Sequence, residues 1–127
     1  MTRVREAIPN VLAVYAYGSR VKGEARSASD LDLALLLPFG QSMPAAHLVQ
    51  LCGDLEALAG CPVEISVLDL ENALVHCKEV VSSGIRLYVA DAQGVASFEM
   101  QTLSGYARLC EDRALVVKAY TVGHAHG

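Results

Sequence analysis

The sequence predicts a single α+β domain, a small mixed β-sheet with helices packed mainly on one face. Helix-like and strand-like segments alternate along the chain, and its 127 residues are enough for one hydrophobic core. Apolar residues make up 53% of the chain and aromatic residues only 6%, which favours a compact core of Val, Leu, Ala and Ile. No repeat or linker interrupts this pattern, so we expect one domain over residues 1–127.

Four short strands are expected, at residues 11–17, 30–37, 62–68 and 85–89. The first is a β-rich apolar run that stops at Gly18. The second is apolar on both faces beyond Asp32, as in a strand inside a covered sheet. In the third, apolar residues alternate with Glu64 and Ser66, so these two side chains are expected on the same face.

Helices are expected at residues 2–10, 44–59, 71–83 and 94–122. Apolar residues recur on one face of the second helix, which Gly60 ends, and Gly84 ends the third. Gly105 is a candidate break in the last helix. This last helix either completes the core or presents a docking surface to another protein, and the sequence leaves both alternatives open.

The overall charge and the cysteines argue against several classes of protein. The formal net charge is −4, so long-range attraction to nucleic acid is not expected. No apolar run reaches the roughly 20 residues of a membrane helix, and residues 1–6 lead into no signal-peptide core. Scattered cysteines without a C-x-x-C pair favour reduced thiols in a cytoplasmic protein and argue against zinc. These residues are Cys52, Cys61, Cys77 and Cys110.

Asp30 and Asp32 are the first candidates for chemistry. Alternate residues of a strand face the same side and lie about 6.5–7 Å apart along the chain, so the two carboxylates are neighbours. Oxygen ligands of this kind suit Mg²⁺ or Mn²⁺, and two such ions support phosphoryl and nucleotidyl transfer. An isolated Asp-x-Asp motif is equally compatible with two solvated acids at the start of a strand.

Gly18 and Ser19 form the second candidate feature. A glycine between a strand and a helical turn lets a phosphate approach the backbone, where exposed N–H groups and the serine hydroxyl bind it. Ordinary strand-to-helix turns also contain such a pair, so the pair alone is not specific.

The spacing of these two features resembles that of a known family. Ten residues separate the Gly-Ser pair from the Asp-x-Asp motif, as in the G-S-x10-D-x-D motif of the DNA polymerase beta nucleotidyltransferase superfamily. Residues 18–33 are similar to its minimal nucleotidyltransferase branch, G-S-R-x-R-G-x5-S-D-x-D-L. Lys22 replaces an arginine there and keeps the charge without the bidentate fork. The other matching positions are Arg20, Gly23, Ser29 and Leu33.

The resemblance implies a palm-like αβ core and a site with defined roles. Asp30 and Asp32 would hold two Mg²⁺ ions, with Mn²⁺ as an alternative, together with a third carboxylate on the neighbouring strand. Glu64 stands at that position, where the minimal branch more often has Asp. A surface role for Glu64 is the alternative, with Asp69 as the fallback third carboxylate. The resemblance also implies that ATP phosphates are bound by Gly18, Ser19, Arg20 and Ser29.

Weaker similarity over residues 72–106 points to the minimal nucleotidyltransferases of HEPN/MNT toxin–antitoxin pairs. These antitoxins transfer AMP from ATP to a tyrosine hydroxyl of a HEPN-domain ribonuclease toxin, which they also bind. The resemblance therefore implies a protein adenylyltransferase with ATP as substrate and a HEPN toxin as partner. No direct partnership with nucleic acid is expected, because 127 residues leave little room for a domain that recognises it. No membrane partner is expected either, because no apolar run is long enough to span a membrane.

The sequence is compatible with two other functions. One is a nucleotidyltransferase that acts on a small molecule or an RNA end. The other is a catalytically degenerate antitoxin that inhibits its toxin only by covering it.

The remaining polar and aromatic side chains are weaker candidates. His47 and His76 are expected to be surface or packing residues, and Tyr15 and Tyr17 to pack in the core. His124 and His126 resemble a metal-binding pair, but chain ends are commonly disordered.

Overall fold

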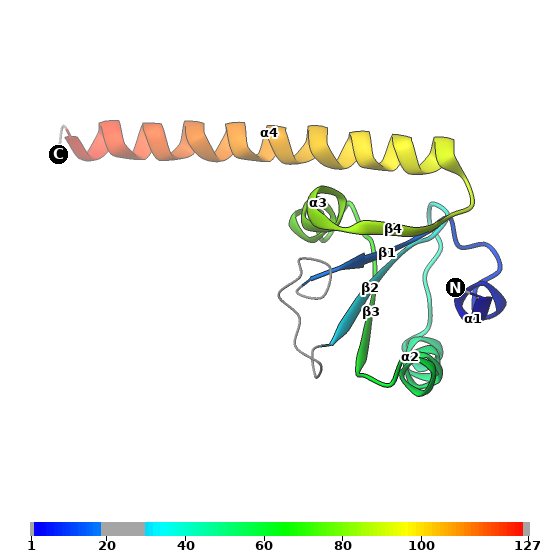
Figure 1. Cartoon of the computed structure of the whole chain (residues 1–127). Coiled ribbons are helices and arrows are strands. Elements are labelled where there is room, and N and C mark those ends of the chain that lie inside the picture. Colours follow the sequence, from blue (N-terminus) through cyan, green and yellow to red (C-terminus); the bar gives the residue numbers. More distant parts are fainter. Residues whose placement is uncertain (1, 19–29, 126–127) are drawn as a thin grey trace.

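The computed structural model describes residues 2–18 and 30–125, with the backbone alone for residues 120–125. Within these residues there are four helices and four strands, as predicted, in the order α1-β1-β2-α2-β3-α3-β4-α4 (Figure 1). The helices are α1 (Thr2–Ala7), α2 (Ala45–Ala59), α3 (Leu74–Ser83) and α4 (Ala92–Ala125). The strands are β1 (Ala13–Tyr17), β2 (Leu31–Leu36), β3 (Val63–Val67) and β4 (Ile85–Val89).

The strands form one mixed sheet in the order β3-β2-β1-β4, which confirms the predicted small mixed sheet. β1 pairs with β2 and β4 in antiparallel fashion, whereas β2 and β3 are parallel. In this register Asp32 lies between Tyr17 on β1 and Glu64 on β3. Residues from three strands are therefore brought side by side at one end of the sheet.

The helices cover both faces of the sheet, which corrects the predicted one-sided packing. α1 and α2 pack on one face, and α3 and the first half of α4 pack on the other (Figure 1). β2 explains this arrangement, because Leu33 and Leu35 enter one buried cluster whereas Ala34 and Leu36 enter the other. A strand that is apolar on both faces must be covered on both faces.

The ends of α1 and α2 follow from local backbone preferences. α1 ends at Ala7, three residues earlier than predicted, because Pro9 disfavours helical geometry at Ile8. α2 ends as predicted at Gly60, whose φ of 72° is left-handed and whose N–H donates to the carbonyl of Glu56 at 2.9 Å.

α3 begins at Leu74, three residues later than predicted. The carboxylate of Asp69 accepts hydrogen bonds from the backbone N–H groups of Glu71 and Asn72, at 3.0 and 3.2 Å. These bonds hold a turn in place of the first helical residues. Asp69 therefore shapes the connection between β3 and α3.

α4 is continuous over 34 residues, so the predicted break at Gly105 is wrong. A Cβ atom at Gly105 would lie 3.5 Å from Cδ1 of Leu74, so this glycine sits where α4 passes close to α3. Val95, Phe98 and Thr102 are buried in the first half of the helix. Residues 111–119 are exposed, and the second half extends beyond the sheet and α3 (Figure 1).

No helix in the described part of the chain has the length and apolar content required to cross a membrane.

A polar cluster fastens α4 to the sheet. The hydroxyl of the buried Tyr15 donates to Oε2 of Glu99 at 2.8 Å, and Nε of Arg86 donates to the same oxygen at 2.9 Å. The hydrogen bond from Arg86 lowers the pKa of Glu99 below its usual value, and the one from Tyr15 contributes in the same direction. Tyr15 thus packs in the core as predicted and also anchors the helix.

Candidate active site

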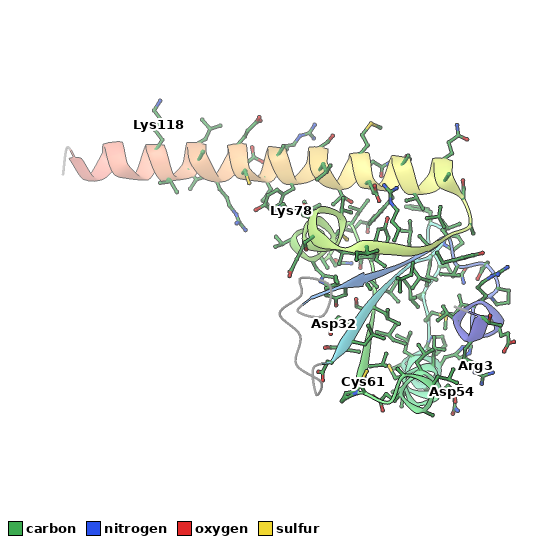
Figure 2. All side chains as sticks on the ribbon, in the orientation of Figure 1. Arg3, Asp32, Asp54, Cys61, Lys78 and Lys118 are labelled. Atoms are coloured by element: carbon green, nitrogen blue, oxygen red, sulfur yellow. The ribbon has the colours of Figure 1, made fainter. Side chains whose placement is uncertain are left out.

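Asp32 and Glu64 are direct register partners on the parallel strands β2 and β3. The alternation of side chains places both on the sheet face that α3 covers, and Asp30 precedes Asp32 by two residues. We call Asp30, Asp32 and Glu64 the acidic corner. Asp32 is half-buried, whereas Asp30 and Glu64 are exposed. Figure 2 shows where Asp32 lies relative to the long helix.

The acidic corner brings several negative charges together. Burial raises the pKa of Asp32 above its usual value, and the neighbouring Glu64 raises it further through its charge and a hydrogen bond between the two carboxyls. The charges of Asp30 and of Glu79 on α3 act in the same direction. Each of these effects penalises the ionised form of Asp32, and a bound cation would relieve the penalty.

Gly18 closes the site on the β1 side. Its φ of +86° is left-handed, and a Cβ atom there would lie 3.3 Å from Cγ of Asp32 and closer still to Oδ2. Only glycine therefore allows the end of β1 to approach the Asp32 carboxylate. Gly18 and Asp32, which belong to the two halves of the family motif, are therefore neighbours in the structure.

A second layer of polar side chains lies against the acidic corner. Oγ of Ser66 is 3.0 Å from Nε2 of His76 and 3.4 Å from the hydroxyl of Tyr17. The rings of Tyr17 and His76 meet edge-on, with their centroids 5.2 Å apart. The sequence predicts only a surface or packing role for His76. Nothing in its own segment indicates the contact, which requires knowing how α3 packs on the sheet.

The donors of the acidic corner fit a hard divalent ion, because all of them are carboxylate oxygens. Among the described residues, no three His, Cys, Asp or Glu side chains are close enough together to hold a metal ion as they stand. Asp32 and Glu64 are paired across β2 and β3, and Asp30 lies exposed just before β2, so the three carboxylates would have to draw closer together around an ion.

Several predicted site residues lie outside the described part of the chain. They are Ser19, Arg20 and Ser29. The motif position Lys22 and the weaker candidate His126 also lie outside it. His124 lies in α4, where only the backbone is described. Asp69 is not part of the acidic corner, because it follows the opposite end of β3 and its carboxylate is engaged in the turn before α3.

A cavity of about 910 Å³ lies at the opposite end of the sheet from the acidic corner. It is bounded by the segment after β2, the turn after β3 and the start of α4, where Met43, Asn72 and Phe98 contribute to its wall. None of the three carboxylates of the acidic corner lines it. Two acidic residues, Asp69 and Glu71, do line it, but the carboxylate of Asp69 already accepts hydrogen bonds from the turn before α3.

Known proteins resemble this chain over most of its length. A family model described as "Polymerase beta, Nucleotidyltransferase" matches residues 2–93. Protein adenylyltransferase MntA of Shewanella oneidensis is 28% identical over 127 residues, which cover 97% of this chain and 88% of the relative. A crystal structure of a toxin–antitoxin with AMP-PNP contains a chain that is 25% identical, with a TM-score of 0.77 and 94% of both chains covered.

A further solved structure resembles the chain in fold. It is the complex of a tri-AMPylated Shewanella oneidensis HEPN toxin with its MNT antitoxin. The matching chain is 22% identical, with a TM-score of 0.72, and the match covers 94% of this chain and 91% of the other.

Proposed function

The chain belongs to the polymerase beta nucleotidyltransferase family, whose model matches residues 2–93, and we propose that it is a magnesium-dependent protein adenylyltransferase. It transfers AMP from ATP to a tyrosine hydroxyl of a partner HEPN ribonuclease toxin and thereby acts as an antitoxin. The observation that carries this proposal is the pairing of Asp32 with Glu64 directly beside Gly18.

The similar proteins support the transferred group, the nucleotide substrate and the class of acceptor in this proposal. The curated relative is itself a protein adenylyltransferase, which supports AMP as the transferred group. The toxin–antitoxin with AMP-PNP holds an analogue of ATP, which supports ATP as the substrate. The HEPN toxin that carries AMP in the related complex motivates the same class of acceptor here.

The site residues fall into two groups, those that bind the triphosphate and those that bind the metal ions. Gly18 lets the end of β1 approach the carboxylate of Asp32, and we assign Gly18, Ser19, Arg20 and Ser29 to the triphosphate from the family motif. We assign Asp30, Asp32 and Glu64 to two Mg²⁺ ions, with Mn²⁺ as a substitute. When bound, these ions supply charge neutralisation at the α-phosphate and at the leaving pyrophosphate.

The transfer itself is a direct displacement. The phenolic oxygen of the acceptor forms a bond to the α-phosphorus, and the bond between that phosphorus and the bridging oxygen of pyrophosphate breaks. The phenolic proton passes to Glu64, which is exposed on the edge strand β3 and reachable by an acceptor. Positioning and electrostatics account for the rate, so no covalent intermediate with the enzyme is required.

The shape of the molecule suits a protein acceptor. α4 extends past the same side of the molecule on which Asp32 lies (Figure 2). An acceptor that contacts the projecting half of α4 would have part of its surface near the acidic corner. We place the reaction in the cytoplasm, where ATP is available and the free thiols of Cys52, Cys77 and Cys110 stay reduced.

The test is to incubate the protein with Mg-ATP and its partner toxin and to determine the mass of the toxin. We expect the toxin to gain AMP, and peptide mapping to locate it on tyrosine. The doubly substituted Asp30→Asn, Asp32→Asn protein is the control and should still bind the toxin without modifying it. An unmodified toxin that is nevertheless inhibited by both proteins would contradict transfer and indicate inhibition by covering alone.

A further inference from the structure

His76 connects α3 to both strands that flank Asp32. Its Nε2 lies 3.0 Å from Oγ of Ser66 on β3, and its ring meets Tyr17 of β1 edge-on, with 74° between the ring planes. We propose that His76 is a positioning residue for the divalent-ion site: it holds Ser66 and Tyr17 so that Asp32 and Glu64 keep the spacing that the ions require. This inference rests on the proposed function.

Ser66 is the first link in this connection. It follows Glu64 by two residues on β3, so both side chains lie on the same face of the sheet. Its hydroxyl also reaches the carbonyl oxygen of Leu33, the residue after Asp32, at 3.5 Å. If the hydroxyl donates to that carbonyl, Nε2–H of His76 donates to Oγ of Ser66, which defines the tautomer of the ring. One hydroxyl thus joins α3, β3 and β2.

Tyr17 is the second link. It pairs directly with Asp32 across the antiparallel strands β1 and β2, and Gly18 follows it. Its hydroxyl is 3.4 Å from Oγ of Ser66, so the tyrosine contacts both the serine and the histidine. A shift of the His76 ring would therefore displace Tyr17 at the end of β1, next to Gly18.

The acidic corner needs such support because its negative charges repel one another. Asp32 and Glu64 are neighbouring carboxylates, and Glu79 on α3 adds a further negative charge nearby. β3 is the edge strand and is hydrogen-bonded within the described sheet only to β2. Repulsion at the start of β2 and β3 acts to separate the two strands, and the bridge from His76 through Ser66 to Leu33 opposes that separation.

The test measures the affinity of the protein for Mn²⁺ in the presence of AMP-PNP. The electron paramagnetic resonance signal of free Mn²⁺ reports the binding, and the measurement needs no acceptor. His76→Phe keeps an aromatic ring beside Tyr17 but removes the nitrogen that contacts Ser66. We expect Mn²⁺ affinity to fall about 10-fold, the range typical of residues that orient metal ligands. His76→Gln, which can restore a hydrogen bond to Ser66, should recover most of that loss. His47→Phe, at an exposed histidine on α2, is the matched control and should leave the affinity unchanged.

A coupling measurement distinguishes positioning from general stability. Ser66→Ala should weaken Mn²⁺ binding as much as His76→Phe does, and the double variant should be no weaker than either, because both remove the same link. If His76→Phe does not fold, Ser66→Ala and His76→Gln decide the question. Unchanged Mn²⁺ affinity in the folded variants would overturn the proposal, even if their melting temperatures fall.

The same experiment separates this inference from the proposed function. A wild-type protein that binds Mn²⁺ with the expected dependence on His76, but transfers no AMP, would contradict the proposed transfer and support the positioning role. A wild-type protein that binds no Mn²⁺ in the presence of AMP-PNP would contradict both.

Discussion

Gly18 and Asp32 approach each other so closely that no side chain fits at position 18 without displacing the carboxylate. The left-handed φ of Gly18 adds a second reason for glycine, because other residues pay a conformational penalty there. The end of β1 and the start of β2 are thereby brought together at the point where the family motif places the triphosphate and the metal ions.

Gly18→Ala is expected to impair both folding and transfer. The left-handed backbone and the overlap with Asp32 should together lower the free energy of unfolding by about 1–3 kcal/mol. Chemical denaturation measures this change, and the mass of the toxin after incubation with Mg-ATP measures transfer. Gly53→Ala is the matched control, because Gly53 lies inside α2 with nothing near its Cβ position. It should stabilise the protein by about 0.5–1 kcal/mol. Equal stability of the two variants would contradict the close approach.

Asp32→Asn is expected to stabilise the ion-free protein while it abolishes transfer. The raised pKa of Asp32 means that the folded state disfavours the ionised carboxylate, so its charge lowers stability at pH values above the folded-state pKa. In EDTA at pH 7 we expect the melting temperature to rise by about 2–4 °C. Calorimetry measures the change, with Asp112→Asn on the exposed part of α4 as the control. A lower melting temperature for Asp32→Asn would show that the charge of Asp32 does not destabilise the folded protein.

Glu99 should make stability depend on pH. Its pKa is lowered from the usual 4.5, mainly by Arg86, so its contribution is fully present above pH 4.5 and is lost as the pH falls through the folded-state value. Glu99→Gln should therefore cost about 1–2 kcal/mol at pH 7 and progressively less below pH 4.5. Denaturation at a series of pH values measures the difference between variant and wild type. A difference that stays constant down to pH 2 would contradict the assignment of the anchor to the ionised carboxylate.

The projecting half of α4 should contribute little to the stability of the domain. Residues 111–119 are exposed, including the apolar Leu115, Val116 and Val117, and none belongs to a buried cluster. The free energy of unfolding of a chain that ends at residue 110 should therefore lie within about 1 kcal/mol of that of the full chain. A matched truncation before Val95 removes buried residues of α4 and should unfold the protein. Large destabilisation by the shorter deletion would show that the projecting half completes the core.

The number of helices and strands could be predicted from the sequence. That the strands of Asp32 and Glu64 are neighbours followed from the family motif. Alternation on β3 correctly put Glu64 and Ser66 on one face, and the neighbourhood of Gly18 and Asp32 followed from the motif spacing. The distribution of helices over both faces was also readable from β2, whose two apolar faces both need cover, although the prediction placed the helices mainly on one. Local patterns of this kind report on a single element and its immediate neighbours.

Features that depend on how distant elements meet could not be predicted. The contact of His76 with Ser66 and Tyr17 requires the position of α3 on the sheet, and the continuity of α4 at Gly105 requires its close packing against Leu74. The start of α3 depended on the hydrogen bonds of Asp69, which compete with the first helical turn.

The central claim is that Asp32 and Glu64 act as a carboxylate pair in AMP transfer, and the most direct test is the rate of that transfer at position 64. Toxin mass is followed over time in Mg-ATP with the wild type, Glu64→Gln and Glu64→Asp. The account predicts a loss on the order of 10²-fold or more for Glu64→Gln, which keeps the shape but not the charge. Glu64→Asp, which keeps a carboxylate, should retain much more of the rate. A Glu64→Gln protein that modifies the toxin at the wild-type rate would contradict the account.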